Sequence, residues 1–459
     1  MKKGKFTLAI IFFLLFRGSL CLGLAPAELG QFNTEDRVLI FAPHPDDEAI
    51  ATGGVIQRAL KAGAKVKIVC YTNGDNNELA FIVYEKRITF KKREFIHMGE
   101  VRRKETIAAM GSLGIPAQDI IFLGYPDFGT MEILTKYWGE TKPFRSMLTK
   151  VSKVPYPECL SPNAPYVGES ILKDLKSVLL DFKPNKIFVS HPADSNRDHR
   201  ALYLFLRVAL WDLQAQIKPP VIFPYIIHVV GWPKPRGYHP DLELIPADKF
   251  KESGIFWQKF VLTQGEIKAK RDATKYYKSQ IKYNPAYLFT FCRKNELYGD
   301  FSSVELKKQK AGLLDWQTLK AYGEEEKSTR AEVKNQIDRI SALAYACSGD
   351  NLFIKLTLTR KRAGVSIFLL GYSKKTDFAQ MPKMNLFVDK YGLHIKDKKQ
   401  TFFIKEIELK YLADTIVIKI PLAALGNPDF ILSWVKARTS DLSVDETSWR
   451  VLELRKEFP

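Results

Sequence analysis

A histidine followed closely by three carboxylates lies near the start of the chain, in the sequence His44-Pro-Asp-Asp-Glu48. A neutral imidazole and a carboxylate are both good zinc ligands, and a second carboxylate one residue away points elsewhere and can accept a proton. The block therefore predicts half of a metallohydrolase centre, with ligands and a general base in one turn.

This block directly follows a continuous apolar run, Val38 to Ala42, which is typical of a strand buried on both faces of a parallel sheet. After Pro45, small and apolar residues predict a helix that ends near Gly63, and the next strand is expected at Lys65 to Thr72. The block thus lies at the carboxyl edge of a sheet, where open α/β folds bind ligands.

A catalytic zinc site usually needs three protein ligands and an open position for water, so a second segment is required. The best candidate is the sequence His191-Pro-Ala-Asp-Ser-Asn-Arg-Asp-His199, which follows another buried-strand pattern at residues 186–190. Both blocks are expected to meet at one sheet edge. Two alternatives stay open for Asp194, which either orients a ligand histidine or caps the turn, while His191 is expected to bond nearby backbone.

Taken in order, the two blocks resemble the PIG-L/LmbE-like family of zinc-dependent N-deacetylases, and the resemblance covers most of residues 37–301. Weaker matches are Val101-Arg-Arg-Lys-Glu105 with Leu113-Gly114, Leu123-Gly-Tyr-Pro-Asp127, Tyr225-Ile-Ile-His228 with Gly231-Trp-Pro, and Lys270 to Gln280. The resemblance implies an α/β fold, a Rossmann-like, doubly wound, mostly parallel sheet. It also implies removal of acetyl from N-acetylglucosamine-type groups in a glycan, glycolipid or envelope polymer.

The resemblance also implies roles for single residues. The implied ligands of zinc (Zn2+) are His44, Asp47 and His199. Asp46 is implied as the general base, because a ligand such as Asp47 would be committed to the metal. Arg102 and Asp127 match family positions that contact sugar hydroxyls, and are expected to bind the N-acetylated amino-sugar substrate.

One catalytic position departs from the family pattern, since many members have a histidine where this chain has Asn196. An amide can still donate a hydrogen bond to an oxyanion, but it carries no charge and no transferable proton. Either Asn196 alone stabilises the oxyanion, or His228 or His239 supplies the missing imidazole, or the rate of hydrolysis is reduced. The alternative functions are a noncatalytic glycan-binding or scaffold protein that retains the fold, and hydrolysis of another amide or ester.

Each candidate also has a purely structural interpretation. The aspartates of the first block would suit a helix start, and Arg102 and Asp127 would suit a solvated helix charge and a turn. Three adjacent polar groups at one strand end and a second histidine block at another favour the catalytic interpretation.

The first 24 residues have the form of a secretory signal peptide, with three lysines in the first five positions and an apolar run from Phe6 to Phe16. This run is short for a membrane span, and Leu20 before Cys21 makes a poor lipobox. Cleavage is therefore favoured over an anchor. We expect an exported protein that is periplasmic or extracellular.

The chain is strongly basic, with a net charge of +19, and the signal segment accounts for little of it. This charge favours anionic envelope glycan or lipid headgroups as partners, with peripheral contact to a membrane. No nucleic-acid motif accompanies the basic runs, so nucleic acid is not expected. The sequence does not indicate an oligomeric state.

Four cysteines follow the signal segment and are widely spaced, without any C-x-x-C motif. Their number permits two disulfides but their spacing specifies none, and it argues against a thiolate zinc site. The four are Cys70, Cys159, Cys292 and Cys347.

The length predicts more than one domain. We expect a deacetylase-like domain at 34–300, a helix and linker at 301–330, and an all-β sandwich at 331–459, which either packs structurally or binds sugar. The helix is expected at Val304 to Lys320. Strands are expected at 351–359, 365–372, 385–388, 402–409, 415–421, 430–437 and 449–454. Two segments, 76–93 and 131–166, are expected to form loops over the site.

Overall fold

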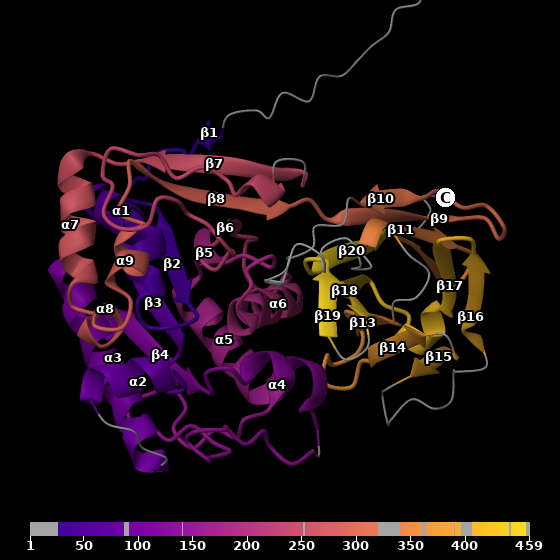
Figure 1. The fold of residues 1–459 in the computed structure, drawn as a ribbon, viewed down its shortest axis with the longest axis horizontal. Helices are drawn as coiled ribbons and strands as arrows, with labels where there is room; N and C mark the ends of the chain where they lie inside the picture. The colour runs from indigo at the N-terminus through magenta and orange to yellow at the C-terminus, as the bar shows by residue number, and fades with distance from the viewer. Residues whose placement is uncertain are drawn as a thin grey trace, which may run out of the picture.

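The computed structural model describes residues 26–86, 91–139, 141–250, 253–319, 340–359, 364–389, 391–395, 406–439 and 442–455. The expected signal peptide and the polar part of the linker lie outside these ranges. The described chain forms an α/β half and a β-rich half that lie side by side (Figure 1). This arrangement confirms an α/β fold followed by a large β-rich region.

The first half is built on an eight-stranded sheet in the order β1-β7-β8-β6-β5-β2-β3-β4. The strands are β1 (Ala27–Glu28), β2 (Arg37–Ala42), β3 (Lys65–Thr72), β4 (Ile120–Tyr125), β5 (Lys186–Ser190), β6 (Val221–Tyr225), β7 (Ile255–Val261) and β8 (Asn295–Phe301). Strands β2 to β6 are parallel to one another, whereas β8 pairs antiparallel with β6 and β7. The order along the chain reverses between β2 and β5, and such a reversal leaves a crevice at the carboxyl ends of the two strands.

Helices lie on both sides of this sheet, with α1, α3 and α7 on one side and α4, α5 and α6 on the other (Figure 1). The helices are α1 (Asp47–Lys61), α2 (Glu78–Glu85), α3 (Lys92–Ser112), α4 (Thr130–Lys136), α5 (Gly168–Phe182), α6 (Arg197–Asp212), α7 (Gln264–Thr274), α8 (Lys278–Ile281) and α9 (Pro285–Phe289), with short 3-10 turns at Ala117–Asp119, Asp248–Phe250 and Leu422–Leu425. Because both faces are covered, the central strands are mainly apolar: in β2, Val38 to Ala42 are completely buried.

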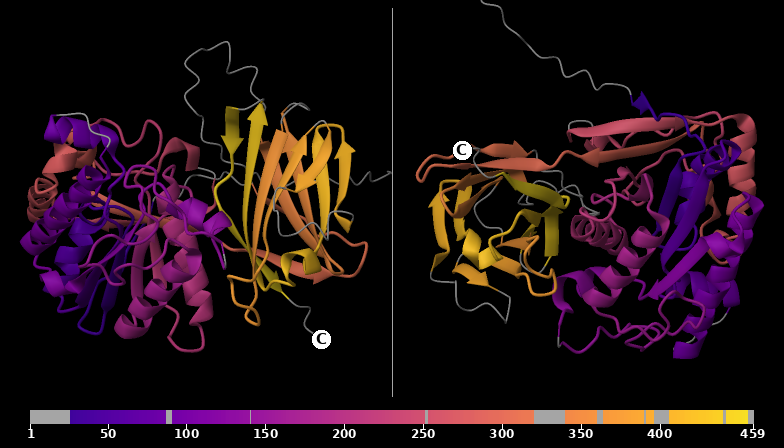
Figure 2. Two further views of the ribbon diagram at one scale, coloured as in Figure 1. Left: turned by 90° about the horizontal axis from the view of Figure 1, so that it is seen from below. Right: turned by 180° about the vertical axis from the view of Figure 1, so that it is seen from behind.

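The second half is a twelve-stranded sheet that curls almost closed (Figure 2). Its strands are β9 (Val304–Gln309), β10 (Gln317–Leu319), β11 (Ile340–Ser348), β12 (Asn351–Leu358), β13 (Gly364–Tyr372), β14 (Lys383–Asp389), β15 (Gly392–Ile395), β16 (Glu408–Leu412), β17 (Thr415–Pro421), β18 (Phe430–Thr439), β19 (Leu442–Glu446) and β20 (Arg450–Arg455). Buried and partly exposed residues alternate in β12, β14 and β17, so each strand presents one face to the core.

One expectation about a connecting segment is wrong, and another holds only in part. The helix expected at Val304 to Lys320 is replaced by β9 and β10, because Val304 and Leu306 are buried while Glu305 is exposed, which is the two-residue period of a strand. The expected loop at 131–166 begins inside α4, but its described residues from 137 onward form a loop as expected. This loop buries Val154 and Tyr156 in the core, because burial of their large side chains is favourable.

Two further features concern the whole described chain. Within the described ranges, none of the helices combines the length and the apolar composition that a membrane span requires. All four cysteines that follow the signal segment are buried there as free thiols, so the structure contains none of the disulfides that their number permits.

Candidate metal centre

The first block forms a tight turn between β2 and α1. The backbone NH of His44 donates to Asp47 Oδ2 at 2.9 Å, and the NH of Asp47 donates back to the His44 carbonyl at 3.2 Å. This reciprocal pair places the Asp47 carboxylate in the first turn of α1, where the positive end of the helix favours negative charge. Both side chains are buried, so their charge is held in a low-dielectric region.

The second block brings its last residue to the same point. His199, in the first turn of α6, places Nε2 at 3.1 Å from Asp47 Oδ2 and 3.2 Å from His44 Nδ1. His44 Nδ1 and Asp47 Oδ2 are 3.4 Å apart. The three ligand candidates therefore form a nearly equilateral triangle, called the ligand triangle below. The structure brings them together as the strand-end argument predicts.

The ligand triangle fits a metal ion. Tetrahedral zinc with bonds of about 2.0–2.2 Å separates its ligand atoms by about 3.3–3.6 Å, close to the observed edges. The two imidazole nitrogens face each other and also face the Asp47 carboxylate. A shared proton or a bound cation would remove the repulsion between their lone pairs. His228 offers a fourth ligand atom, and all four atoms lie within 4.8 Å of one another. The nitrogen and oxygen donor set is one that zinc accepts.

The far side of the His44 ring faces two carboxylates. His44 Nε2 is 3.2 Å from Asp127 Oδ1 and 3.5 Å from Asp198 Oδ2. Burial alone would lower the pKa of His44, but Asp127, Asp198 and Asp47 together raise it well above its usual value. Asp127 was expected to contact substrate, and the structure shows it in contact with His44. A second, smaller group that could hold a cation is formed by His44, Asp127 and Asp198.

Asp194 both faces the candidate ligand His199 and caps the turn, the two roles that the sequence leaves open. Its Oδ2 lies 3.3 Å from His199 Nδ1 and accepts hydrogen bonds from the backbone NH groups of Ile227 and His228. Its Oδ1 accepts from the NH of Asn196 and so caps the turn before α6. Although burial opposes it, the facing His199 lowers the pKa of Asp194, and in return Asp194 and Asp47 raise the pKa of His199 to about 9 against the effect of burial.

His191 lies outside the ligand triangle. Its Nδ1 accepts a hydrogen bond from the NH of Ala193 at 3.0 Å, and the side chain is completely buried. Burial lowers its pKa to about 3. The expectation that His191 bonds nearby backbone therefore agrees with the structure.

Asp46 occupies the turn in a strained backbone conformation, with φ at 126° and ψ at −31°. A non-glycine residue adopts positive φ only when its surroundings enforce it. Here the NH of Asp46 donates to Glu48 Oε2 at 3.2 Å, and its carboxylate lies 3.4 Å from Arg102 Nη2. Burial raises the pKa of the Asp46 carboxyl to about 8; Arg102 opposes the rise, and Asp47 and Glu48 add to it.

Arg102 is also part of the support for this turn. The guanidinium donates to the carbonyl of Pro45 at 2.7 Å and to the carbonyl of Gly74 at 2.9 Å, and only 3% of the residue is exposed. It was expected to contact the sugar, and the structure shows contacts with the two loops beside Asp46.

A cavity of about 470 Å³ opens beside these groups. Among the sequence-predicted residues, those that line it are His44, Asp46, Asp47, Arg102, Asp127 and Asn196. His199 lies beneath the surface and is completely buried. The lining includes Asn77, from the expected loop at 76–93, but no residue from 131–166.

Residues 39–210, which contain both histidine blocks, match the family model described as PIG-L: GlcNAc-PI de-N-acetylase. These residues form a PIG-L family domain.

Two relatives of the PIG-L domain carry the same name, 1D-myo-inositol 2-acetamido-2-deoxy-alpha-D-glucopyranoside deacetylase. The protein from Tsukamurella paurometabola is 35% identical over 91 residues, which are 19% of this chain and 30% of the relative. The protein from Kineococcus radiotolerans is 34% identical over 112 residues, 23% of this chain and 27% of the relative. The chain thus spans less than a third of either relative.

Among solved structures, N,N'-diacetylchitobiose deacetylase from Pyrococcus horikoshii aligns with 53% of this chain and 70% of its own. The sequence identity is 20% and the TM-score is 0.32.

Three polar residues bear on the missing family histidine. Asn196 is the N-cap of α6, and its side-chain oxygen accepts from the NH of Asp198 at 2.8 Å, so only its amide nitrogen remains to donate. His228 lines the cavity, with its ring 4.7 Å from that of His199 and its Nδ1 3.0 Å from the Tyr287 hydroxyl. His239 is absent from the lining.

Two tyrosines support the site through contacts that the sequence did not predict. The hydroxyl of Tyr277 bonds the Glu48 carboxylate, which in turn holds the NH of Asp46. The hydroxyl of Tyr287 lies against His228. Tyr277 lies in the segment from Lys270 to Gln280 that resembles the family, but it is 229 residues from Glu48 in the sequence, so only the tertiary fold shows this contact. Tyr287 lies outside the segments that the sequence singled out.

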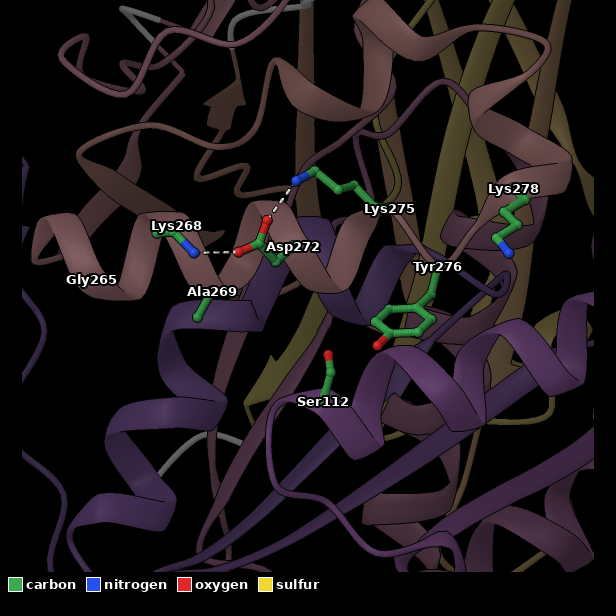
Figure 3. Close-up of a pocket in the computed structure, with 8 residues that line it drawn as sticks. All are labelled: Ser112, Gly265, Lys268, Ala269, Asp272, Lys275, Tyr276 and Lys278. Atoms are coloured by element: carbon green, nitrogen blue, oxygen red, sulfur yellow. Dashed lines mark hydrogen bonds and ion pairs between the residues drawn. The ribbon is translucent and has the colours of Figure 1, made fainter.

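A second hollow, of about 510 Å³, lies on the outer surface near α7 (Figure 3). The one carboxylate in its lining is already paired, because Asp272 bonds both Lys268 at 2.8 Å and Lys275 at 2.6 Å. None of the eight residues drawn is a histidine or cysteine. The cavity beside the ligand triangle is therefore the better candidate for chemistry.

Proposed function

We propose that this protein is a zinc-dependent N-deacetylase that hydrolyses the acetamide of an N-acetylglucosamine-type amino sugar in a glycan, glycolipid or envelope polymer. The observation that carries the proposal is the buried ligand triangle of His44, Asp47 and His199, which opens into a cavity beside an unliganded carboxylate, Asp46. The family match and the names of the two relatives support an N-acetylated amino sugar as the substrate.

Zinc, when bound, lowers the pKa of a water molecule and polarises the amide oxygen of the substrate. The three residues of the ligand triangle would hold it. Asp127 and Asp194 would hold the other nitrogen of each ligand imidazole, which fixes the tautomer and the ring orientation. Two independent carboxylate–histidine pairs are thus in place around one triangle.

Asp46 would accept the proton of the attacking water and return it to the leaving amine. Its carboxylate lies on the cavity wall and faces Arg102 rather than the ligand triangle, so it is not consumed by metal binding. Asn196 and His228 both line the cavity, and we propose the amide nitrogen of Asn196 and the imidazole of His228 as donors to the developing oxyanion.

We retain Arg102 and Asp127 as proposed substrate contacts because both line the cavity. Each would combine that role with its observed contact, to the Asp46 turn or to His44. Arg236, which also lines the cavity, adds positive charge that suits an anionic glycan or lipid headgroup.

Three larger-scale features belong to the same proposal. The strand order, with its reversal between β2 and β5, supports a Rossmann-like doubly wound sheet with a domain near residues 34–300. The common core of β11, β12 and β17 with β13, β14 and β18 supports a β-sandwich formed by opposite sides of the curled sheet. Export to the periplasm or the cell exterior rests on the N-terminal sequence alone.

The test follows acetate release by the zinc-loaded protein from N-acetylglucosaminyl lipids, chitooligosaccharides and methyl N-acetylglucosaminide. The variant Asp46→Asn keeps the shape of the side chain but removes the base, so we expect the rate to fall at least about 100-fold while zinc content is unchanged. The matched control is Asp181→Asn, which alters an exposed aspartate on α5. No acetate from any substrate with native protein would contradict the proposal, as would an Asp46→Asn variant with the native rate.

A further inference from the structure

The two halves of the molecule share one buried contact surface, and α6 lies at its centre, facing β18, β19 and β20 (Figure 1). The Trp211 ring of α6 stacks on Phe430 of β18, with centroids 4.5 Å apart and an interplanar angle of 7°. The hydroxyl of Tyr372, in β13, donates to Asp212 at the end of the same helix. The helix that carries His199 is therefore packed against the β-rich half.

An ion pair crosses the same surface next to the metal centre. Arg200 Nη1 lies 2.7 Å from Glu446 Oε1, at the end of β19, and the two side chains are only 7% and 15% exposed. Arg200 directly follows His199 in the sequence. Solvent screens such a shielded pair less than it screens a surface pair, so its geometry is held more firmly.

The same arginine reaches the loop that orients His199. Arg200 Nε donates to the backbone carbonyl of Asp194, whose carboxylate faces His199 Nδ1 at 3.3 Å. A continuous series of contacts thus leads from Glu446 in the β-rich half, through Arg200 and Asp194, to a nitrogen of His199.

A second contact covers the start of this loop. The His191 ring lies 5.0 Å from that of Phe301, and the guanidinium of Arg450, in β20, lies 3.1 Å from the Phe301 ring centroid. The β-rich half therefore supports the loop between β5 and α6 near both of its ends.

We propose that the β-rich half is a structural part of the metal centre, and that Glu446 and Arg200 are positioning residues for the zinc ligand His199. Loss of the Glu446 charge frees Arg200 to turn away from the Asp194 carbonyl, and the loop then holds His199 less firmly in the ligand triangle. The inference rests on the proposed zinc site, and it deepens that proposal by making metal affinity depend on a contact between the two halves.

The experiment measures the dissociation constant of zinc by competition with a chelating indicator, and the thermal unfolding midpoint, for the full chain. Glu446→Gln keeps the side-chain volume and removes the charge. The matched control is Tyr372→Phe, which removes a hydrogen bond across the same surface to the far end of α6. Because outer contacts of metal ligands alter affinity by about 10-fold to 100-fold and this contact is one step more distant, we expect Glu446→Gln to weaken zinc binding about threefold to tenfold.

Tyr372→Phe is expected to bind zinc within about twofold of the native protein, because the contact it removes lies remote from His199. Binding is measured well below the lowest unfolding midpoint, so that every variant is folded. Native affinity in Glu446→Gln, or an equal loss in both variants, would overturn the inference. Acetate release by the native protein in the same preparation tests the deacetylase proposal separately.

Discussion

At the scale of single residues, the two nitrogens of His44 face different groups: one faces the other two members of the ligand triangle and the other faces two supporting carboxylates. Its Nδ1 faces Asp47 and His199, while its Nε2 faces Asp127 and Asp198. A carboxylate beside Nε2 favours the proton on that nitrogen and leaves the Nδ1 lone pair for a metal. The orientation of one imidazole thus decides on which side of its ring a cation would bind.

Asp127→Asn is predicted to weaken zinc binding about tenfold or more, because the neutral amide no longer fixes the Nε2–H tautomer of His44. The dissociation constant is measured by indicator competition, with the exposed Asp181→Asn as control. Unchanged affinity would show that Asp127 does not support the ligand, and would leave it with the substrate role alone.

At the scale of elements, the start of α1 stores strain at the position of the proposed base. Asp46 adopts a φ of 126° because the turn is held from three sides: by the His44–Asp47 pair, by Glu48 and by Arg102. Such conformations cost of order 1–3 kcal/mol and persist where they serve a site. Here the strain directs the Asp46 side chain towards Arg102 while Asp47 joins the ligand triangle.

The strain predicts an order of stability between two variants that lack the Asp46 carboxylate. The free energy of unfolding of Asp46→Gly is expected to be about 1–2 kcal/mol higher than that of Asp46→Ala, because glycine tolerates positive φ and alanine does not. Urea unfolding of both variants measures the difference, and both remove the same charge. Equal stability, or a more stable alanine variant, would show that the turn is not strained.

The sequence predicted the site where the candidate ligands lie in a block that directly follows a strand. His44, Asp47 and His199 could be expected to meet because each block follows a buried parallel strand, and such strands end at the same edge. Pairings such as Arg102 with the Pro45 carbonyl depend on side-chain directions across dozens of residues, which no local pattern encodes. The wrong helix at 304–320 arose because the strand period of β9 extends over only six residues.

At the scale of the whole molecule, the surface between the two halves buries a histidine that is not a ligand. His191 stacks on Trp257 and lies near Phe301, and the guanidinium of Arg450, from the β-rich half, lies over the Phe301 ring. Burial lowers its pKa to about 3; Arg450 and Lys249 add to this effect, and Asp194 opposes it. The folded protein therefore keeps this ring neutral at pH values where the unfolded chain would protonate it.

This pKa shift predicts a specific loss of stability in acid. The contribution of neutral His191 to the free energy of unfolding is fully present above pH 6.5, which is the pKa of this histidine in the unfolded chain. It is lost as the pH falls from about 6.5 towards 3, by up to roughly 1.4 kcal/mol per pH unit. His191→Phe, which keeps an aromatic ring, is expected to show a shallower fall. Urea unfolding between pH 7.5 and pH 4 compares the two proteins, and identical slopes would contradict the prediction.

The position of the metal tests the central claim most directly, and zinc-edge anomalous diffraction from crystals of the zinc-loaded protein measures it. The ligand triangle predicts one strong peak about 2.0–2.2 Å from His44 Nδ1, Asp47 Oδ2 and His199 Nε2. A peak instead beside His44 Nε2, between Asp127 and Asp198, or no peak at either place, would contradict it.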